Sequence, residues 1–184
     1  MRISKAPEER RQEIIDASKE LFLQRGFAKT RIGDIAEHLG IAKGLFYYYF
    51  HNKDEVMGAI IDDYIQAMVN AVREIAAKDI DYREKLSGIV FAIIDCAEET
   101  QHVFSDLSLN DHSLLHQSVL EHTLERLEEV LDEVVDDGVK HGVIHSKNPH
   151  TLIKILFYGL GMMDFSSMDR NTILEMVAQV MGIR

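Results

Sequence analysis

Residues 26–54 read GFAKTRIGDIAEHLGIAKGLFYYYFHNKD, which contains two short stretches of apolar periodicity separated by a glycine. The first stretch, residues 32–39, repeats apolar side chains at helical spacing, and Thr30 precedes it as a candidate N-cap. Gly40 marks a tight turn, and residues 43–49 form the second stretch. Two short helices joined by a glycine turn are typical of a helix-turn-helix, whose second helix enters the major groove of DNA.

Helical periodicity continues on both sides of this segment, and the chain contains no sequence repeat or low-complexity linker. Pro7 suits the first position of a helix, and Gly26 suits the position just after its end. Asn52 is a candidate cap for a long helix that couples the two halves of the chain. The expected helices are residues 7–25, 32–39, 43–49, 53–77, 82–98, 101–109, 112–141, 149–166 and 170–182.

The charge of the chain is unevenly distributed. The net charge of −11 by itself argues against a protein that binds a polyanion. Residues 1–53, however, hold ten Lys/Arg against seven Asp/Glu, whereas residues 54–184 hold ten against twenty-four. This asymmetry predicts that nucleic acid contacts only the N-terminal part. We expect an all-α fold, with a three-helix helix-turn-helix domain (residues 1–53) joined by the long helix to a larger helical domain (residues 54–184).

Neither a disulfide nor a membrane segment is expected. The single cysteine, Cys96, lies among apolar residues, which favours a buried and inert thiol. Residues 1–20 are charged and lack the apolar core of a signal peptide. The longest run without a charged residue, residues 155–163, is far shorter than the roughly twenty residues that span a bilayer. The sequence therefore predicts a soluble, cytoplasmic protein.

The segment from Gly26 to Asp54 resembles the DNA-binding region of the TetR (tetracycline repressor) family. The matching positions are Gly26-Phe27, Thr30, Ile35-Ala36, Gly40-Ile41, Lys43-Gly44, Tyr47, Tyr49-Phe50 and Lys53. The resemblance is strong over about residues 8–56, and beyond them only the length and the helical pattern fit. It implies an all-α homodimer that binds a palindromic DNA operator, usually as a repressor, and whose larger domain binds a ligand and forms the dimer.

Eight residues are candidates for contact with DNA. They are Thr30, Arg31, Lys43, Gly44, Leu45, Tyr47, Tyr48 and Lys53. The resemblance implies that Thr30, Tyr47 and Lys53 hold phosphates. It also implies that four residues face the bases: Lys43, Gly44, Leu45 and Tyr48. Arg31 replaces a small residue of the family and could add a phosphate or groove contact. Ala42 stands where Ser or Thr usually caps the reading helix, a cap worth about 1 kcal/mol.

The aromatic run at residues 46–50 has ordinary core as its alternative interpretation. The family pattern places Phe46, Tyr49 and Phe50 inside the domain. Tyr47 and Tyr48 are expected outside, where their hydroxyl groups can donate hydrogen bonds to DNA.

A ligand cavity is expected among the helices of residues 54–125. Met and Phe form adaptable apolar walls, although simple core is the alternative for each candidate. The candidate lining residues are Met57, Ile61, Tyr64, Met68, Phe91, Ile94, Asp95, Phe104, Leu107, Leu115 and Val119. Residues 86–125 contain seven carboxylates and no Lys or Arg, so a pocket there has no evident group to neutralise an anion. This favours a small hydrophobic effector that is neutral or cationic, with solvated acidic faces as the alternative.

A dimer interface is expected on the last two helices. Residues 149–166 are apolar on nearly every side, which predicts that a second chain covers them. With residues 170–182 they would form a four-helix bundle across a two-fold axis, and intramolecular core is the alternative. The candidate interface residues are Leu152, Ile155, Leu156, Gly159, Met163, Ile173, Val177 and Val180.

Histidines raise a different possibility, because His112 and His116 are four residues apart on an expected helix and such a pair can bind a metal ion. A metal-dependent hydrolase would use this pair with a carboxylate. No His-Glu-x-x-His pattern and no convincing nucleophile accompany it, so we expect no metal, no cofactor and no enzyme. The leading hypothesis is a repressor that its effector releases from DNA. The alternative is a DNA-binding dimer controlled by a protein partner or by nothing.

Overall fold

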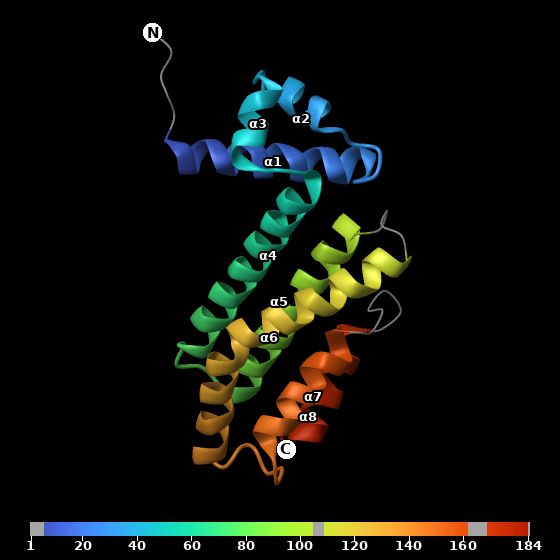
Figure 1. Cartoon of the computed structure of the whole chain (residues 1–184). Coiled ribbons are helices and arrows are strands. Elements are labelled where there is room, and N and C mark those ends of the chain that lie inside the picture. The colour runs from blue at the N-terminus through green and yellow to red at the C-terminus, as the bar shows by residue number, and fades with distance from the viewer. Residues whose placement is uncertain (1–5, 105–108, 162–168, 184) are drawn as a thin grey trace. The chain divides into compact units, whose positions relative to one another are not determined.

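The computed structural model describes residues 6–104, 109–161 and 169–183, and it describes side chains in 6–100, 120–159 and 169–183. The described residues form eight helices and no strand (Figure 1). The helices are α1 (Pro7–Arg25), α2 (Ile32–His38), α3 (Lys43–Tyr49), α4 (Lys53–Ala76), α5 (Tyr82–Phe104), α6 (Leu109–Lys140), α7 (Pro149–Gly161) and α8 (Arg170–Met181). The all-α prediction is therefore confirmed. None of these helices is long and apolar enough to cross a membrane.

The predicted helix boundaries hold to within about a residue for α1 to α4 and fail in α5. The expected break between residues 98 and 101 is absent, because α5 runs unbroken from Tyr82 to Phe104. The residues at the expected break are Glu99 and Thr100, and neither is a Gly or Pro that would end a helix. Thr100 is also buried, so the helix continues through this position. The predicted end at Gly142 is confirmed, because α6 ends at Lys140 and Gly142 has a φ of 67°.

The chain divides into two compact units inside α4. The first unit contains residues 1–64 and 99–112, and the second contains 65–98 and 113–184. The domain boundary expected at residue 53 lies at the start of α4, whereas the two units divide after Tyr64, within the same helix. The first turns of α4 pack on α1, where Gln12 donates a hydrogen bond to Asp63 (2.8 Å) and the Lys19 ammonium lies 3.9 Å from the centroid of the Tyr64 ring.

The first unit is built around buried aliphatic and aromatic side chains of α1 to α4. These are Ile14, Ile15, Leu21, Phe22, Ile35, Phe46, Phe50, Val56 and Ile60. Two glycines with positive φ, Gly26 (85°) and Gly40 (62°), make the turns that follow α1 and α2. Asn52 accepts a hydrogen bond from the Glu55 N–H at 2.8 Å, which confirms Asn52 as the cap of α4.

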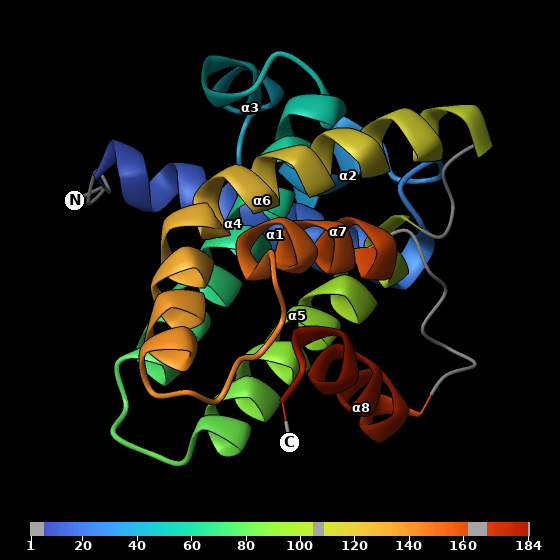
Figure 2. The ribbon, with the colours of Figure 1, turned by 90° about the horizontal axis from the view of Figure 1, so that it is seen from below.

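The second unit has its own apolar core between α5, α6 and α8. The buried members are Leu86, Val90, Ile94, Val135, Ile144, Ile173, Val177, Met181 and Ile183. Helices α7 and α8 contact each other, and Figures 1 and 2 draw them from two sides. Asp169 caps α8 by accepting a hydrogen bond from the Thr172 N–H at 3.0 Å. Cys96 was expected to be buried, but the structure shows it only half-buried.

Candidate nucleic-acid interface

Helix α3 is anchored to the first unit by aromatic side chains. Phe46 is fully buried and its ring centroid lies 6.0 Å from that of Phe50, which is 2% exposed. The guanidinium of Arg11 lies 4.9 Å from the centroid of the Phe50 ring and ties α1 to the end of α3. The expected inward positions of Phe46 and Phe50 are confirmed. Tyr49 differs, because it is only half-buried and stacks edge-on against Tyr48 at 5.0 Å.

The opposite face of α3 is open, and we call its residues Lys43, Gly44, Leu45, Tyr47 and Tyr48 the reading surface. Tyr47 and Tyr48 are 52% and 76% exposed. Lys43 and Gly44 are exposed, and Leu45 is half-buried. A Cβ atom added at Gly44 would meet nothing within 4 Å, so the backbone there is open to close approach. The arrangement gives a slender surface with one cation and two phenol groups, which suits a DNA groove.

Thr30 is buried, and one of the two roles that the sequence suggested for it is wrong. It is 1% exposed, and its hydroxyl group donates to the Gly26 carbonyl (2.8 Å), with a longer contact to the Leu21 carbonyl (3.3 Å). The prediction that Thr30 caps α2 is wrong, because the N-cap residue is Arg31. The Thr30 side chain fastens the loop after α1 and offers no surface to a phosphate.

The two helix starts beside the reading surface are capped differently. Arg31 is exposed, and its N–H donates to the Asp34 carboxylate at 2.8 Å, which closes the first turn of α2. Ala42 supplies no side-chain cap to α3, as its sequence predicted. Helix α3 therefore depends on Phe46 and Phe50 for its position.

Lys53 is held within the protein. Its ammonium group donates to the Phe27 carbonyl at 2.5 Å and lies 4.3 Å from the centroid of the Phe27 ring. Burial lowers the pKa of Lys53, while the nearby carboxylates of Asp54 and Asp34 act in the opposite direction. The residue joins the start of α4 to the loop after α1, which leaves only part of its donor capacity for a phosphate.

The second unit contains an apolar cavity of about 40 Å³. Hydrophobic side chains of α5, α6, α7 and α8 line it: Leu86, Ile89, Val90, Ile93, Ile94, Leu131, Ile153, Leu156, Phe157 and Val177. Of the eleven residues predicted to line a ligand cavity, only Ile94 is among them. Met57, Ile61 and Met68 are buried core residues, while Tyr64 and Phe91 are half-buried.

Asp95, the one charged residue predicted to line a ligand cavity, forms an ion pair. Arg170, at the start of α8, donates to Asp95 and to Glu98 of α5, each at 2.6 Å. These carboxylates raise the pKa of the Arg170 guanidinium. The inference that residues 86–125 lack a neutralising cation was wrong for these two acids, because Arg170 reaches them from 72 or more residues away in sequence.

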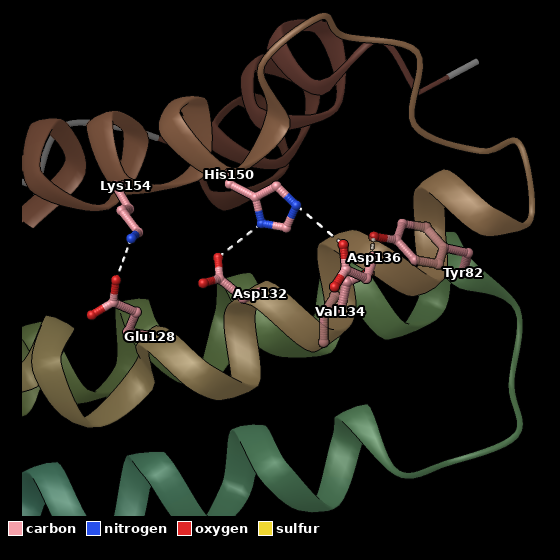
Figure 3. Close-up of polar contacts among 7 residues, drawn as sticks. All are labelled: Tyr82, Glu128, Asp132, Val134, Asp136, His150 and Lys154. Atoms are coloured by element: carbon pink, nitrogen blue, oxygen red, sulfur yellow. Dashed lines mark hydrogen bonds and ion pairs between the residues drawn. The ribbon is translucent and has the colours of Figure 1, made fainter.

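A cluster of polar contacts joins α7 to α6 (Figure 3). His150 lies between two carboxylates, with Nδ1 at 2.9 Å from Asp132 and Nε2 at 3.1 Å from Asp136. One turn further along α7, Lys154 donates to Glu128, and this contact raises the pKa of Lys154. Sequence reasoning missed this cluster, although the spacing of the three acids by four residues on α6 was a readable signal.

The residues predicted for a dimer interface separate into two groups. Ile173 and Val177 are 0% and 2% exposed in the core of the same chain, so their assignment to the interface was wrong. Leu152 and Leu156 pack partly against that core. The remaining described residues are outside it: Ile155 (61% exposed), Gly159 (exposed) and Val180 (40% exposed).

Several predicted residues lie outside the part of the chain described in side-chain detail. These are Phe104, Leu107, Leu115, Val119 and Met163, together with His112 and His116. In the described part, no group of three or more His, Cys, Asp or Glu side chains is placed to hold a metal ion.

Comparison with known proteins shows which family the helix-turn-helix part of the chain matches. Residues 14–60 match the family model of bacterial regulatory proteins, tetR family. The transcriptional repressor KstR2 of Rhodococcus jostii is 30% identical over 100 residues, which cover 53% of this chain and 49% of the relative. The chain thus spans about half the length of the curated relatives it first matches. These relatives are named transcription regulators and not enzymes, so they give no support to a hydrolase.

Solved structures extend the likeness of the fold to nearly the whole chain. The fatty acid degradation regulator FadR from Bacillus halodurans is 22% identical, with a TM-score of 0.67 over 97% of this chain and 96% of that one. RolR in complex with resorcinol is 18% identical, with a TM-score of 0.68 over 96% of this chain and 89% of that one. Residues 14–60 of this chain therefore match the tetR family of bacterial regulatory proteins, and the fold of the chain is similar to that of these solved structures.

Proposed function

We propose that the chain is a transcriptional regulator that binds a palindromic DNA operator as a homodimer and is released from it by a small apolar effector. The observation that carries the DNA-binding part is the reading surface of α3, where Lys43, Tyr47 and Tyr48 are exposed on a helix anchored by the buried Phe46. The excess of Lys and Arg in residues 1–53 supports the same assignment, because phosphate contacts dominate affinity for DNA. Such a regulator works in the cytoplasm, where the DNA is.

The dimer surface that we propose lies on α7 and α8. Ile155 and Tyr158 of α7 are 61% and 38% exposed, and Met176 and Val180 of α8 are 43% and 40% exposed. Since α7 and α8 contact each other, these four apolar side chains provide a surface that a second copy would cover. We call these four residues the dimer surface.

The effector that we propose enters the apolar cavity between α5, α6, α7 and α8. All ten residues that line it are hydrophobic, which favours an uncharged or largely hydrocarbon group. The names of two neighbours in fold, a fatty acid degradation regulator and a resorcinol complex, point to ligands with an apolar skeleton. The cavity volume of about 40 Å³ is small compared with the pockets that hold most small molecules, so an effector would have to move the lining side chains as it enters.

The DNA-binding proposal is tested by selecting sites from random duplex DNA with the purified protein. We expect a palindromic site whose half-sites are about one helical turn apart. Tyr47→Phe then weakens binding to every sequence by about tenfold, because a hydrogen bond to a charged group contributes about 1.5–3 kcal/mol. Tyr64→Phe, which removes a phenol hydroxyl group from α4 outside the reading surface and the dimer surface, is the control and leaves DNA affinity unchanged. Failure to select any site would overturn the proposal.

The effector part is tested separately by a thermal-shift screen with neutral lipophiles, cationic amphiphiles, fatty acids, acyl thioesters and divalent metals. A ligand at about a hundred times its Kd raises stability by about 2.7 kcal/mol, which is a readable rise in Tm. A hit is assigned to the cavity when Ile94→Phe, which fills it, removes the shift and keeps DNA binding. If no compound raises the Tm, the partner-controlled alternative replaces the effector.

A further inference from the structure

Gly33 lies directly beneath the side chain of Lys43. Gly33 is the second residue of α2, and Lys43 is the first residue of α3. A Cβ atom built at Gly33 would lie 3.0 Å from Cε and 3.1 Å from Nζ of Lys43. Carbon atoms in contact prefer a separation of about 3.5–4.0 Å, so any larger residue would displace the end of the lysine.

The backbone of α2 does not itself need a glycine at this position. Gly33 is absent from the described glycines with positive φ, which are Gly26, Gly40, Gly142 and Gly182. Glycine inside a helix is less stable than alanine by about 1 kcal/mol. The consequence of glycine at position 33 is therefore the space above its Cα atom, and the Lys43 side chain occupies that space.

The close approach to Gly33 limits where the Lys43 ammonium can lie. Among the described residues no carboxylate forms an ion pair with Lys43, although the residue is exposed at the start of the reading surface. A lysine reads a base edge through one ammonium group whose position decides which acceptor it reaches. A methyl group at position 33 would require the end of Lys43 to move by a few tenths of an ångström, which alters the length and angle of its hydrogen bond to that acceptor.

We propose that Gly33 is a positioning residue that sets which base pair Lys43 reads. The inference rests on the proposed DNA-binding function and deepens it, because it names a residue of α2 as a determinant of specificity in α3. Gly33 itself presents no side chain to the DNA and acts only through Lys43.

A double-mutant cycle tests this proposal, using the operator selected for the unchanged protein and every single-base variant of its half-site. Gly33→Ala changes the preference at the base pair read by Lys43 by about tenfold, a size typical for one base contact. Lys43→Met removes the ammonium and keeps a long side chain. In the Lys43→Met background, Gly33→Ala changes no base preference, because no ammonium is left to displace.

Two further measurements separate positioning from a structural effect. Gly33→Ala keeps the Tm or raises it, since alanine favours the helix, and it leaves the affinity for non-specific DNA and its salt dependence unchanged. Gly58→Ala is the matched control, because a Cβ atom at Gly58 of α4 meets nothing within 4 Å, and it changes neither base preference nor affinity.

The possible outcomes distinguish the inference from the function on which it rests. If the unchanged protein selects no site, the proposed function fails. If it selects a site and Gly33→Ala has the same base preferences, or if Gly33→Ala has equal effects with and without Lys43, only the positioning role is overturned. A loss of all DNA binding, specific and non-specific, would also overturn the positioning role.

Discussion

Gly138 of α6 is the place where the described structure leaves least room for another residue. A Cβ atom there would lie 2.5 Å from Oη and 2.6 Å from Cζ of Tyr82, and 2.8 Å from Cδ1 of Ile144. The Tyr82 hydroxyl group donates to the Val134 carbonyl at 3.0 Å, so the ring crosses α6 at this point (Figure 3). The contact fixes the start of α5 against α6.

We expect Gly138→Ala to lower the free energy of unfolding by about 1–3 kcal/mol, because the added methyl group overpacks the site. Urea denaturation followed by circular dichroism measures the change. Gly58→Ala serves again as control, since its helix has space for a methyl group, and it should keep or raise stability. An unchanged midpoint for Gly138→Ala would contradict the tight contact with Tyr82.

Tyr82 also gives the second unit a dependence on alkaline pH. Burial, and to a smaller degree Asp137, raises the pKa of Tyr82 from 10.0 to about 12. In the unfolded chain the hydroxyl group loses its proton near pH 10, whereas in the folded chain it keeps it to about pH 12. The contribution of Tyr82 to stability is therefore complete below pH 10 and is lost as pH rises through 12.

Denaturation curves of the unchanged protein and Tyr82→Phe, measured between pH 9 and 12, test this dependence. The stability difference between the two proteins should shrink as the pH rises. Ultraviolet absorbance of tyrosinate should show one late-titrating tyrosine that Tyr82→Phe lacks. A constant difference across the whole range would be inconsistent with the raised pKa.

At single residues, prediction from sequence succeeded for a side chain that caps the next helix and failed for side chains that donate to the backbone carbonyl groups of the segment after α1. Asn52 caps the helix that follows it directly, so local spacing identified it. Thr30 and Lys53 donate to the carbonyl groups of Gly26 and Phe27, and backbone acceptors leave no trace in a pattern of side chains. Both residues therefore received a DNA role that their intramolecular contacts limit.

At the scale of elements, a cluster of polar contacts joins α7 to α6. In it, His150 and Lys154 of α7 contact three carboxylates of α6. The pairs are partly exposed, so each contributes little by itself and is weakened by salt. Their effect is expected on the motion of α7 more than on global stability.

We expect Glu128→Gln combined with Asp132→Asn to speed hydrogen exchange of the α7 amides severalfold, with little change in α1 to α3. The ion pair of Lys154 with Glu128 and the negative charge of Asp132 beside His150 are both lost in this variant. Hydrogen exchange detected by mass spectrometry measures it. Glu84→Gln, an exposed acid of α5, is the control and leaves α7 unchanged. Equal exchange in all three proteins would show that the cluster does not hold α7.

Periodicity predicted helices well because it reports which face is apolar, but it does not report where a helix ends. The false break before residue 101 arose where no Gly or Pro was present, and Thr100 in fact lies buried in the continuing helix. The sequence also indicated correctly that α7 and α8 are apolar. It did not indicate which of their apolar residues belong to the core and which lie at the surface. Ile173 and Val177 face their own chain, which only tertiary packing decides.

At the scale of the whole molecule, the charge division and the dimer surface belong to one proposal. A palindromic operator needs two reading surfaces, so a monomer should lose most of its affinity for it. The fold class and the DNA-binding motif followed from the sequence. The position of the apolar cavity did not, because its walls come from four helices that meet only in the folded chain.

We expect Ile155→Asp combined with Val180→Asp to convert the dimer to a monomer, since the change places two charges per chain in an apolar interface. Analytical ultracentrifugation measures the association state, and circular dichroism checks the fold. Val139→Asp is the matched control, because Val139 of α6 is 47% exposed outside the dimer surface. A doubly substituted protein that still sediments as a dimer would move the interface elsewhere.

Helix α4 belongs to both compact units, since the division falls after Tyr64 in the middle of an uninterrupted helix from Lys53 to Ala76. A recombination event between two such regulators would therefore have to respect helical phase. Each residue gained or lost in α4 turns everything beyond it by about 100° and shifts it by about 1.5 Å. Exchange of the C-terminal part between relatives is thus restricted to junctions that conserve the length of α4. The length of this helix therefore limits which domain combinations can arise by recombination.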